Sequence, residues 1–152
     1  MKIILIRHGQ AEDETRPDSA RQLTDFGQQQ AAQTAEYITA RYHPDCFLVS
    51  PYDRAQQTLA ALQSLLPSVP SKIQENITPS DDARHALTDI ANIEVECLVI
   101  VCHMSIVANI TGLLTDDYPE SFSLGEVRVF EMDFVMAGMA REIDRFVPDQ
   151  PY

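Results

Sequence analysis

Short runs of apolar residues constrain the fold of this chain most. They occupy 3–6, 47–49 and 98–102, and none of them contains a polar residue. Uninterrupted apolar runs of strand length are typical of strands that a parallel sheet buries on both faces. Longer segments with a helical spacing of apolar residues separate these runs. The alternation predicts an α/β fold in which helices cover both faces of a mostly parallel sheet.

Proline and capping residues bound the expected elements. We expect Thr24 or Asp25 to start a first helix that ends before Pro44, and Pro67 to stop a second helix. The expected strands cover 2–6, 46–50, 71–77, 96–102 and 143–147, and the expected helices cover 25–43, 53–66, 81–92 and 105–114.

The last part of the chain has a different pattern. Phe130, Met132 and Phe134 alternate with acidic residues, and Gly138 marks a turn before the last strand. This alternation predicts a partly exposed antiparallel hairpin. A chain of 152 residues that is 45% hydrophobic is long enough for one well-buried domain. We therefore expect residues 1–152 to form a single-domain three-layer α/β/α fold with a mostly parallel sheet and a C-terminal antiparallel hairpin.

Cationic and imidazole side chains follow each of the apolar runs. Arg7-His8-Gly9 ends the first run, Arg54 lies just after the second, and His103 follows the third directly. Because the carboxyl ends of parallel strands meet at one edge of the sheet, we expect these side chains to converge. A guanidinium presents a planar fork to two phosphate oxygens, so the pair Arg7 and Arg54 predicts a phosphate cradle.

The charge and the cysteines exclude several classes of function. A net charge of -12, from 23 acidic and 11 basic residues, argues against nucleic acid or anionic lipid as a partner. The apolar run before Arg7 is too short for a signal peptide or a membrane span, so we expect a cytoplasmic protein without a membrane partner. The cysteines and histidines have no metal-ligand spacing, and we expect no disulfide, metal or cofactor.

Two further motifs accompany Arg7-His8-Gly9. They are Leu23-Thr24-x-x-Gly27-x-x-Gln30-Ala31 and Ser50-Pro51-x-x-Arg54-Ala55-x-Gln57-Thr58. In this order the motifs resemble those of the histidine phosphatase superfamily, which also contains the cofactor-dependent phosphoglycerate mutases. Within that superfamily, so short a chain looks most like the small bacterial phosphohistidine phosphatases. The resemblance implies a phosphoglycerate mutase-like fold and a histidine phosphatase domain over 1–152.

Phosphoryl transfer needs donors for the phosphoryl oxygens and an in-line nucleophile. We expect His8 to be the nucleophile: its neutral imidazole attacks phosphorus, and water then hydrolyses the resulting phosphohistidine. The nearby cations favour the neutral form of His8. His103 is expected to stabilise the transferring group as a hydrogen-bond donor. The resemblance therefore implies a metal-independent phosphohistidine phosphatase.

Four other residues are candidates for substrate binding. Gln10 directly follows the Arg-His-Gly motif, where it can touch phosphate or the attacking water. Arg21 resembles an arginine that small members of the family carry ahead of the Leu-Thr motif. The main-chain amides of Met104 and Ser105 begin the helix after the third apolar run, and amides at a helix start bind anions.

The general acid departs from the family pattern. Mutase-like members use a carboxylate to protonate an oxygen leaving group, whereas this chain aligns Asn76 there and places Glu75 one residue away. Without an acid, esters with poor leaving groups should react slowly, but an imidazole leaving group gains its proton readily near neutral pH. The sequence thus favours phosphohistidine as the substrate. We expect a signalling or phosphotransfer protein to carry it, and we expect the enzyme to be a monomer.

Two other functions stay open at this point. A broad small-molecule phosphomonoesterase of the same superfamily would use the same residues but prefer small esters. A non-catalytic module that binds phosphoproteins would keep its affinity when His8 is replaced by alanine. A mutase is disfavoured, because so short a chain offers little lid to keep water from a phosphorylated intermediate. A cysteine-dependent phosphatase is rejected, because residues 102–108 contain neither arginine nor glycine.

Overall fold

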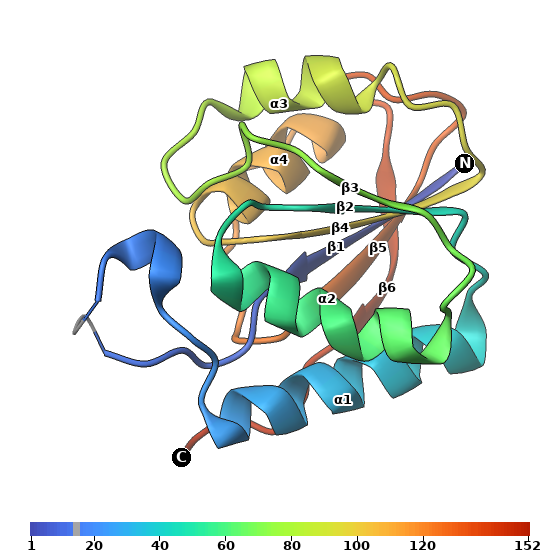
Figure 1. The fold of residues 1–152 in the computed structure, drawn as a ribbon. Helices are drawn as coiled ribbons and strands as arrows, with labels where there is room; N and C mark the ends of the chain where they lie inside the picture. Colours follow the sequence, from blue (N-terminus) through green and yellow to red (C-terminus); the bar gives the residue numbers. More distant parts are fainter. Residues whose placement is uncertain (14–15) are drawn as a thin grey trace.

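The computed structural model describes residues 1–13 and 16–152, in which six strands form one mixed sheet (Figure 1). The strands are β1 (Lys2–Arg7), β2 (Cys46–Val49), β3 (Ser71–Ile73), β4 (Cys97–Cys102), β5 (Val127–Glu131) and β6 (Arg141–Phe146). Their order is β3-β2-β4-β1-β5-β6. The pairs β1 with β4, β4 with β2 and β2 with β3 are parallel, whereas β5 is antiparallel to both β1 and β6.

Helices cover both faces of this sheet. The described residues form η1 (Asp18–Ala20), α1 (Asp25–Arg41), α2 (Asp53–Leu65), α3 (Ala83–Ile90) and α4 (Ile106–Thr115). Figure 1 shows α1 and α2 on one face and α3 and α4 on the other, which confirms the three-layer α/β/α prediction. In the part of the chain that is described, no helix has the length and apolar character needed to cross a bilayer.

The apolar run of β1 explains how the two halves of the core form. Successive side chains of a strand point to opposite faces of the sheet. Ile3 and Leu5 pack into the cluster that also includes residues of α3 and α4, whereas Ile4 and Ile6 pack into the cluster of α1 and α2. All four side chains are fully buried. β1 therefore has to be apolar at every position because it has a helix layer on each side.

The helix boundaries follow the capping residues. The Thr24 hydroxyl accepts a hydrogen bond from the Gly27 amide at 3.0 Å, which confirms Thr24 as the N-cap of α1. Asp82 caps α3 in the same way, and α2 ends at Leu65, before Pro67. Each of these caps satisfies an amide that the first turn of a helix leaves without an intrahelical partner.

The strand predicted over 71–77 is shorter than expected. β3 ends at Ile73, which pairs with Val49. Since Val49 is also the last residue of β2, no strand remains beyond it for further pairing. The chain leaves the sheet after the Gln74 amide has donated to the Val49 carbonyl.

The C-terminal antiparallel hairpin is confirmed, with two corrections. β5 begins at Val127 rather than near Phe130, and it is buried because its side chains pack into the core clusters on the two faces of the sheet. Phe134 lies beyond the strand and is 54% exposed, so the alternation does not extend that far. Gly138 has a φ of +76°, a left-handed conformation that favours glycine, in the turn before β6.

Candidate active site

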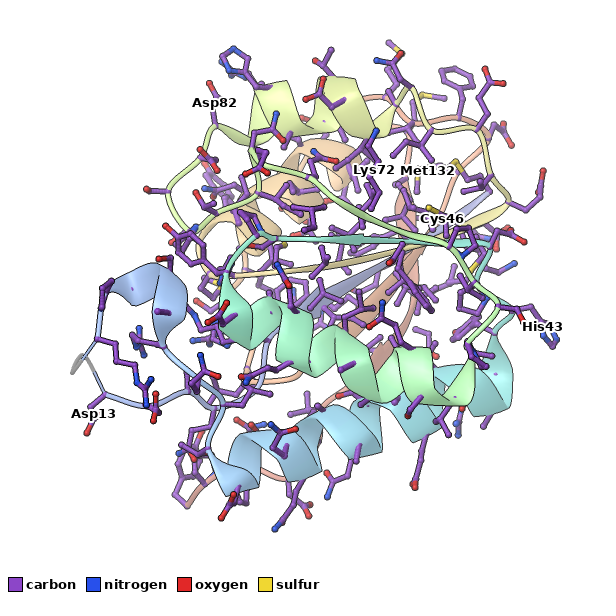
Figure 2. All side chains as sticks on the ribbon, in the orientation of Figure 1. Asp13, His43, Cys46, Lys72, Asp82 and Met132 are labelled. Atoms are coloured by element: carbon purple, nitrogen blue, oxygen red, sulfur yellow. The ribbon has the colours of Figure 1, made fainter. Side chains whose placement is uncertain are left out.

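Three adjacent strands, β1, β4 and β2, bring the candidate residues to one edge of the sheet. Arg7 is level with Cys102, and Val49 is level with Val101. The residues that follow these strands therefore start from neighbouring positions. Figure 2 shows Asp13 at the end of the molecule where α1 and α2 begin and His43 at the opposite end, far from this edge.

His8 is buried and held in one tautomer. Its Nδ1 lies 2.6 Å from the Gly9 carbonyl oxygen, and Arg54 Nε donates to its Nε2 at 3.2 Å. Because a carbonyl only accepts, Nδ1 carries the proton and Nε2 keeps its lone pair. Burial, reinforced by the charges of Arg54 and Arg7, lowers the pKa of His8 to about 3, against the opposing effect of the Gly9 bond. The imidazole is therefore neutral near pH 7, and the unprotonated Nε2 carries an electron pair that accepts from Arg54.

Two glycines allow the His8 loop to lie against the start of α1. A Cβ on Gly9 would lie 2.7 Å from the Gly27 carbonyl oxygen, and a Cβ on Gly27 would lie 2.1 Å from the Gln10 carbonyl oxygen. Both distances are far below a normal van der Waals contact. The Gly9 amide also donates to the Thr58 hydroxyl of α2 at 3.1 Å. The motif glycines therefore fix the backbone that carries the imidazole.

Arg54 lies in the first turn of α2, with only 4% of its surface exposed. Besides the bond from Nε to His8, Nη1 donates to the main-chain oxygen of Asp18 at 2.6 Å and Nη2 to its carboxylate at 3.3 Å. The structure thus brings Arg54 and His8 into direct contact, and it adds Asp18, which the sequence reasoning missed. The signal was weak, since Asp18 lies outside the predicted elements and outside the three motifs.

Arg7 has an unused donor. Its Nη1 donates to the Phe122 carbonyl at 2.7 Å, whereas its Nε is buried without a hydrogen-bond partner among the described residues. Burial lowers the pKa of Arg7, the Glu126 carboxylate opposes this change, and the charge of Arg54 adds to it. A buried guanidinium N–H without a partner costs free energy, which an incoming anion would recover.

His103 has a second unused polar atom. The side chain is fully buried, its Nε2 lies 2.7 Å from the Ser50 hydroxyl, and its Nδ1 has no partner among the described residues. Its ring lies 5.1 Å from that of His8, centroid to centroid. Burial, followed by the neighbouring His8 and Arg54, lowers the pKa of His103 to about 2. When the Ser50 hydroxyl donates to Nε2, the proton of the neutral ring is on Nδ1 and is free to be donated.

Tyr52 and Ser50 complete the wall beside His103. The Tyr52 ring meets the His103 ring edge-on at 5.2 Å, and the Tyr52 amide donates to the Ser50 hydroxyl at 3.2 Å. Neither residue was predicted for the site. Ser50 could have been found, because it begins the Ser-Pro motif that also contains Arg54.

Of the predicted substrate-binding residues, Arg21 is linked to the site and Gln10 turns away from it. Arg21 Nη1 donates to the Asp18 carboxylate at 2.9 Å, so Asp18 bridges Arg21 and Arg54. The side-chain oxygen of Gln10 accepts from the Thr24 hydroxyl at 2.7 Å. A phosphate contact by the Gln10 side chain would require that bond to break.

Met104 and Ser105, which directly follow His103, both make internal contacts. The Met104 sulfur accepts from the Phe122 amide at 3.4 Å, and the Ser105 amide donates to the Pro79 carbonyl at 3.2 Å. Ser105 is exposed and precedes the first residue of α4. The Ser105 amide is thus not aimed at the imidazoles in this arrangement, and anion binding by these two residues stays a prediction.

The region proposed for the general acid contains Asn76, whose side chain is an amide and not a carboxylate. Its amide donates to Asp89 and its carbonyl accepts from Gln74, both at 2.7 Å. Glu75 is exposed at the surface.

Comparisons with known proteins agree with this fold. The sequence model of the histidine phosphatase superfamily (branch 1) matches residues 3–78. The chain belongs to this superfamily, as its motifs predicted.

Among curated proteins, a phosphohistidine phosphatase SixA homolog of Haemophilus influenzae is 32% identical over 127 residues, covering 75% of this chain and 77% of the relative. Among solved structures, the protein histidine phosphatase SixA complexed with tungstate superposes with a TM-score of 0.87 at 24% identity, covering 97% of each chain. A phosphoserine phosphatase of Entamoeba histolytica in complex with 3-phosphoglyceric acid gives a TM-score of 0.72 at 17% identity, covering 99% of this chain and 98% of that one. These structural likenesses concern the fold.

Proposed function

We propose that this protein is a phosphatase that removes phosphate from phosphohistidine in proteins, through a phosphohistidine intermediate on His8. The observation that carries the proposal is the fixed tautomer of His8, whose Nε2 lone pair faces the Arg54 guanidinium. The unused Arg7 Nε and His103 Nδ1 supply further donors for a phosphoryl group. The similarity to the Haemophilus influenzae relative, a phosphohistidine phosphatase SixA homolog, supports the same substrate class.

In the first step, His8 Nε2 attacks the phosphorus atom of the substrate. A bond forms between Nε2 and phosphorus while the bond from phosphorus to the substrate imidazole breaks. The electron pair of the broken bond goes to the leaving nitrogen, which takes a proton from solvent water. Arg7, Arg54 and His103 donate to the equatorial oxygens, whose demand for positive donors is greatest in the transition state.

In the second step, water attacks the phosphorus atom on His8. The bond from phosphorus to Nε2 breaks, its electron pair returns to Nε2, and the attacking water becomes part of inorganic phosphate. The hydrogen bond from Nδ1 to the Gly9 carbonyl keeps the ring in the same tautomer for the next cycle.

The leaving group decides between phosphohistidine and ordinary phosphate esters. An alkoxide leaving group needs a general acid, but the Asn76 side chain is an amide that is bonded to Gln74 and Asp89. An imidazole leaving group has a pKa close to neutral pH, so it gains its proton readily and depends less on a general acid. This difference supports a phosphoramidate substrate over esters.

The wider proposal concerns the context of the reaction. Residues 1–152 act as one domain, and the protein is a monomer in the cytoplasm. Its partner is a phosphohistidine-bearing signalling or phosphotransfer protein. Gln10, Arg21, Met104 and Ser105 are the proposed substrate contacts beyond the four catalytic residues. The reaction requires no metal, so turnover should persist in EDTA, and restoration of a lost activity by a divalent ion would contradict this proposal.

The decisive experiment compares a phosphohistidine protein with a panel of sugar and nucleotide phosphates. We expect kcat/KM to be highest for the phosphohistidine protein. Rapid acid-free quenching should trap acid-labile, base-stable phosphate on His8, and a His8→Ala variant should trap none and turn over no substrate. Faster hydrolysis of small esters would instead establish the phosphomonoesterase alternative, and acid-stable label on a serine would refute the mechanism.

A further inference from the structure

Asp18 accepts hydrogen bonds from two of the three nitrogens of Arg54. Its main-chain oxygen accepts from Arg54 Nη1 at 2.6 Å, and its carboxylate accepts from Nη2 at 3.3 Å. The remaining nitrogen, Nε, donates to His8. Each nitrogen of the Arg54 guanidinium therefore already has one partner, so three of its five N–H groups are in use.

The Asp18 carboxylate is held as an anion between two arginines. One of its oxygens accepts from Arg21 Nη1 at 2.9 Å and the other from Arg54. Burial alone would raise the pKa of Asp18, but the hydrogen bonds and charges of Arg21 and Arg54 outweigh it and lower the pKa below its usual value. A carboxylate oxygen and a phosphoryl oxygen accept hydrogen bonds from the same guanidinium donors. The Asp18 carboxylate thus competes with a phosphoryl oxygen for Arg54 Nη2.

We propose that Asp18 is a specificity-determining residue, whose carboxylate is the resident anion of Arg54 and has to be displaced before a phosphoryl group can bind. The inference rests on the proposed function and deepens it. Every anion that binds Arg54 has to supply the free energy that is lost when the Asp18 carboxylate is displaced. Free inorganic phosphate can supply it only from its own contacts with the site.

A phosphoryl group attached to a protein has a further source of binding free energy. Asp18 begins η1, which Figure 1 shows in the loop that projects beyond the start of α2. Its side chain is 49% exposed. A protein partner can therefore contact this turn while its phosphohistidine enters, and those contacts offset the loss of the Asp18 bonds. Asp18 accordingly favours protein substrates and helps to expel the phosphate product.

The first test measures binding of inorganic phosphate and of orthovanadate by calorimetry to the wild-type chain and to Asp18→Asn. The substitution keeps the size of the side chain and removes its charge. We expect the Kd of both anions to fall about three- to tenfold, the size of a charge-assisted hydrogen bond that is partly exposed to solvent. Asp18→Ala should change the Kd in the same direction.

A matched control is Asp53→Asn. The Asp53 carboxylate accepts at 2.8 Å from Gln22, which lies in the same stretch of chain as Asp18. Asp53 is not among the described acceptors of Arg54. Asp53→Asn removes the same charge near the site but breaks no bond to Arg54. The Kd for phosphate should therefore stay within about twofold of wild type, as for a surface charge screened by salt. An equal fall in the phosphate Kd in both variants would attribute the effect to net charge and overturn the proposal.

The second test compares substrates by kcat/KM. Asp18→Asn should raise kcat/KM for phosphoramidate, a small substrate, relative to that for a phosphohistidine protein. A phosphate Kd that is unchanged or higher in Asp18→Asn, or an unchanged ratio between the two substrates, would overturn the proposal. The binding test requires no turnover, so failure of the proposed function, which is absence of hydrolysis by the wild-type chain, is distinguished from failure of this inference.

Discussion

Replacing Arg54 by lysine separates the geometry of the guanidinium from its charge. Arg54 is 4% exposed and donates through Nε, Nη1 and Nη2 in a single plane. A lysine ammonium keeps the positive charge but is a compact group that cannot present two parallel donors to a phosphoryl group. Loss of one preorganised donor to a transition state typically costs about 3–4 kcal/mol, or about 100- to 1,000-fold in kcat. We expect a loss of that size for Arg54→Lys.

The assay for Arg54→Lys is a single-turnover measurement of His8 phosphorylation with a phosphohistidine protein, together with steady-state kcat/KM. Arg84→Lys is the control, because Arg84 is exposed on α3 and its replacement should leave both rates unchanged. Thermal unfolding of each variant shows whether the loss arises in a folded chain. A folded Arg54→Lys variant with a rate within tenfold of wild type would refute the reasoning, since charge alone would then account for the role of Arg54.

Three further changes test the packing and electrostatics around the site. Gly27→Ala places a Cβ 2.1 Å from the Gln10 carbonyl oxygen and should lower the free energy of unfolding in urea by about 1–3 kcal/mol. Glu126→Gln leaves Arg128 buried without its carboxylate partner and should cost about 3–5 kcal/mol in the same assay, whereas the double replacement with Arg128→Met should cost less. Burial, with a smaller contribution from nearby positive charge, lowers the pKa of His8 from 6.5 to about 3. As the pH falls, this histidine therefore binds a proton at a higher pH in the unfolded chain than in the folded chain. The free energy of unfolding should therefore fall as the pH drops from 6.5 towards 4, by about 1.4 kcal/mol per pH unit for this histidine.

The controls for these changes are exposed residues of the same types. Gln29→Ala on α1 and Glu36→Gln should leave the free energy of unfolding within about 0.5 kcal/mol of wild type. His8→Asn should reduce the pH dependence, whereas replacement of the exposed His43 by asparagine should not. A fully stable Gly27→Ala chain, a double replacement as costly as Glu126→Gln alone, or a His8→Asn chain with unchanged pH dependence would each contradict the corresponding argument.

The sequence by itself determined the layers of the fold and the sheet edge at which the candidate residues lie. The run 3–6 could be interpreted as a doubly covered strand because burial on both faces leaves no position for a polar side chain. Arg7, His8 and His103 could be assigned to one edge because parallel strands carry their carboxyl ends to the same side. The start of α1 followed from Thr24, since capping depends on residues that are close in the chain.

Only the tertiary structure decided which partners these side chains have. Asp18 reaches Arg54, the Phe122 carbonyl reaches Arg7, and Ser50 reaches His103, in each case across a distance in the chain that no local pattern encodes. Arg128 in β5 differs, because its partners Glu126 and the Ser121 carbonyl are near in the chain, and only its burial was decided by the fold. Local periodicity reports which face of an element is apolar, whereas hydrogen-bond partners depend on where the folded chain brings distant segments together.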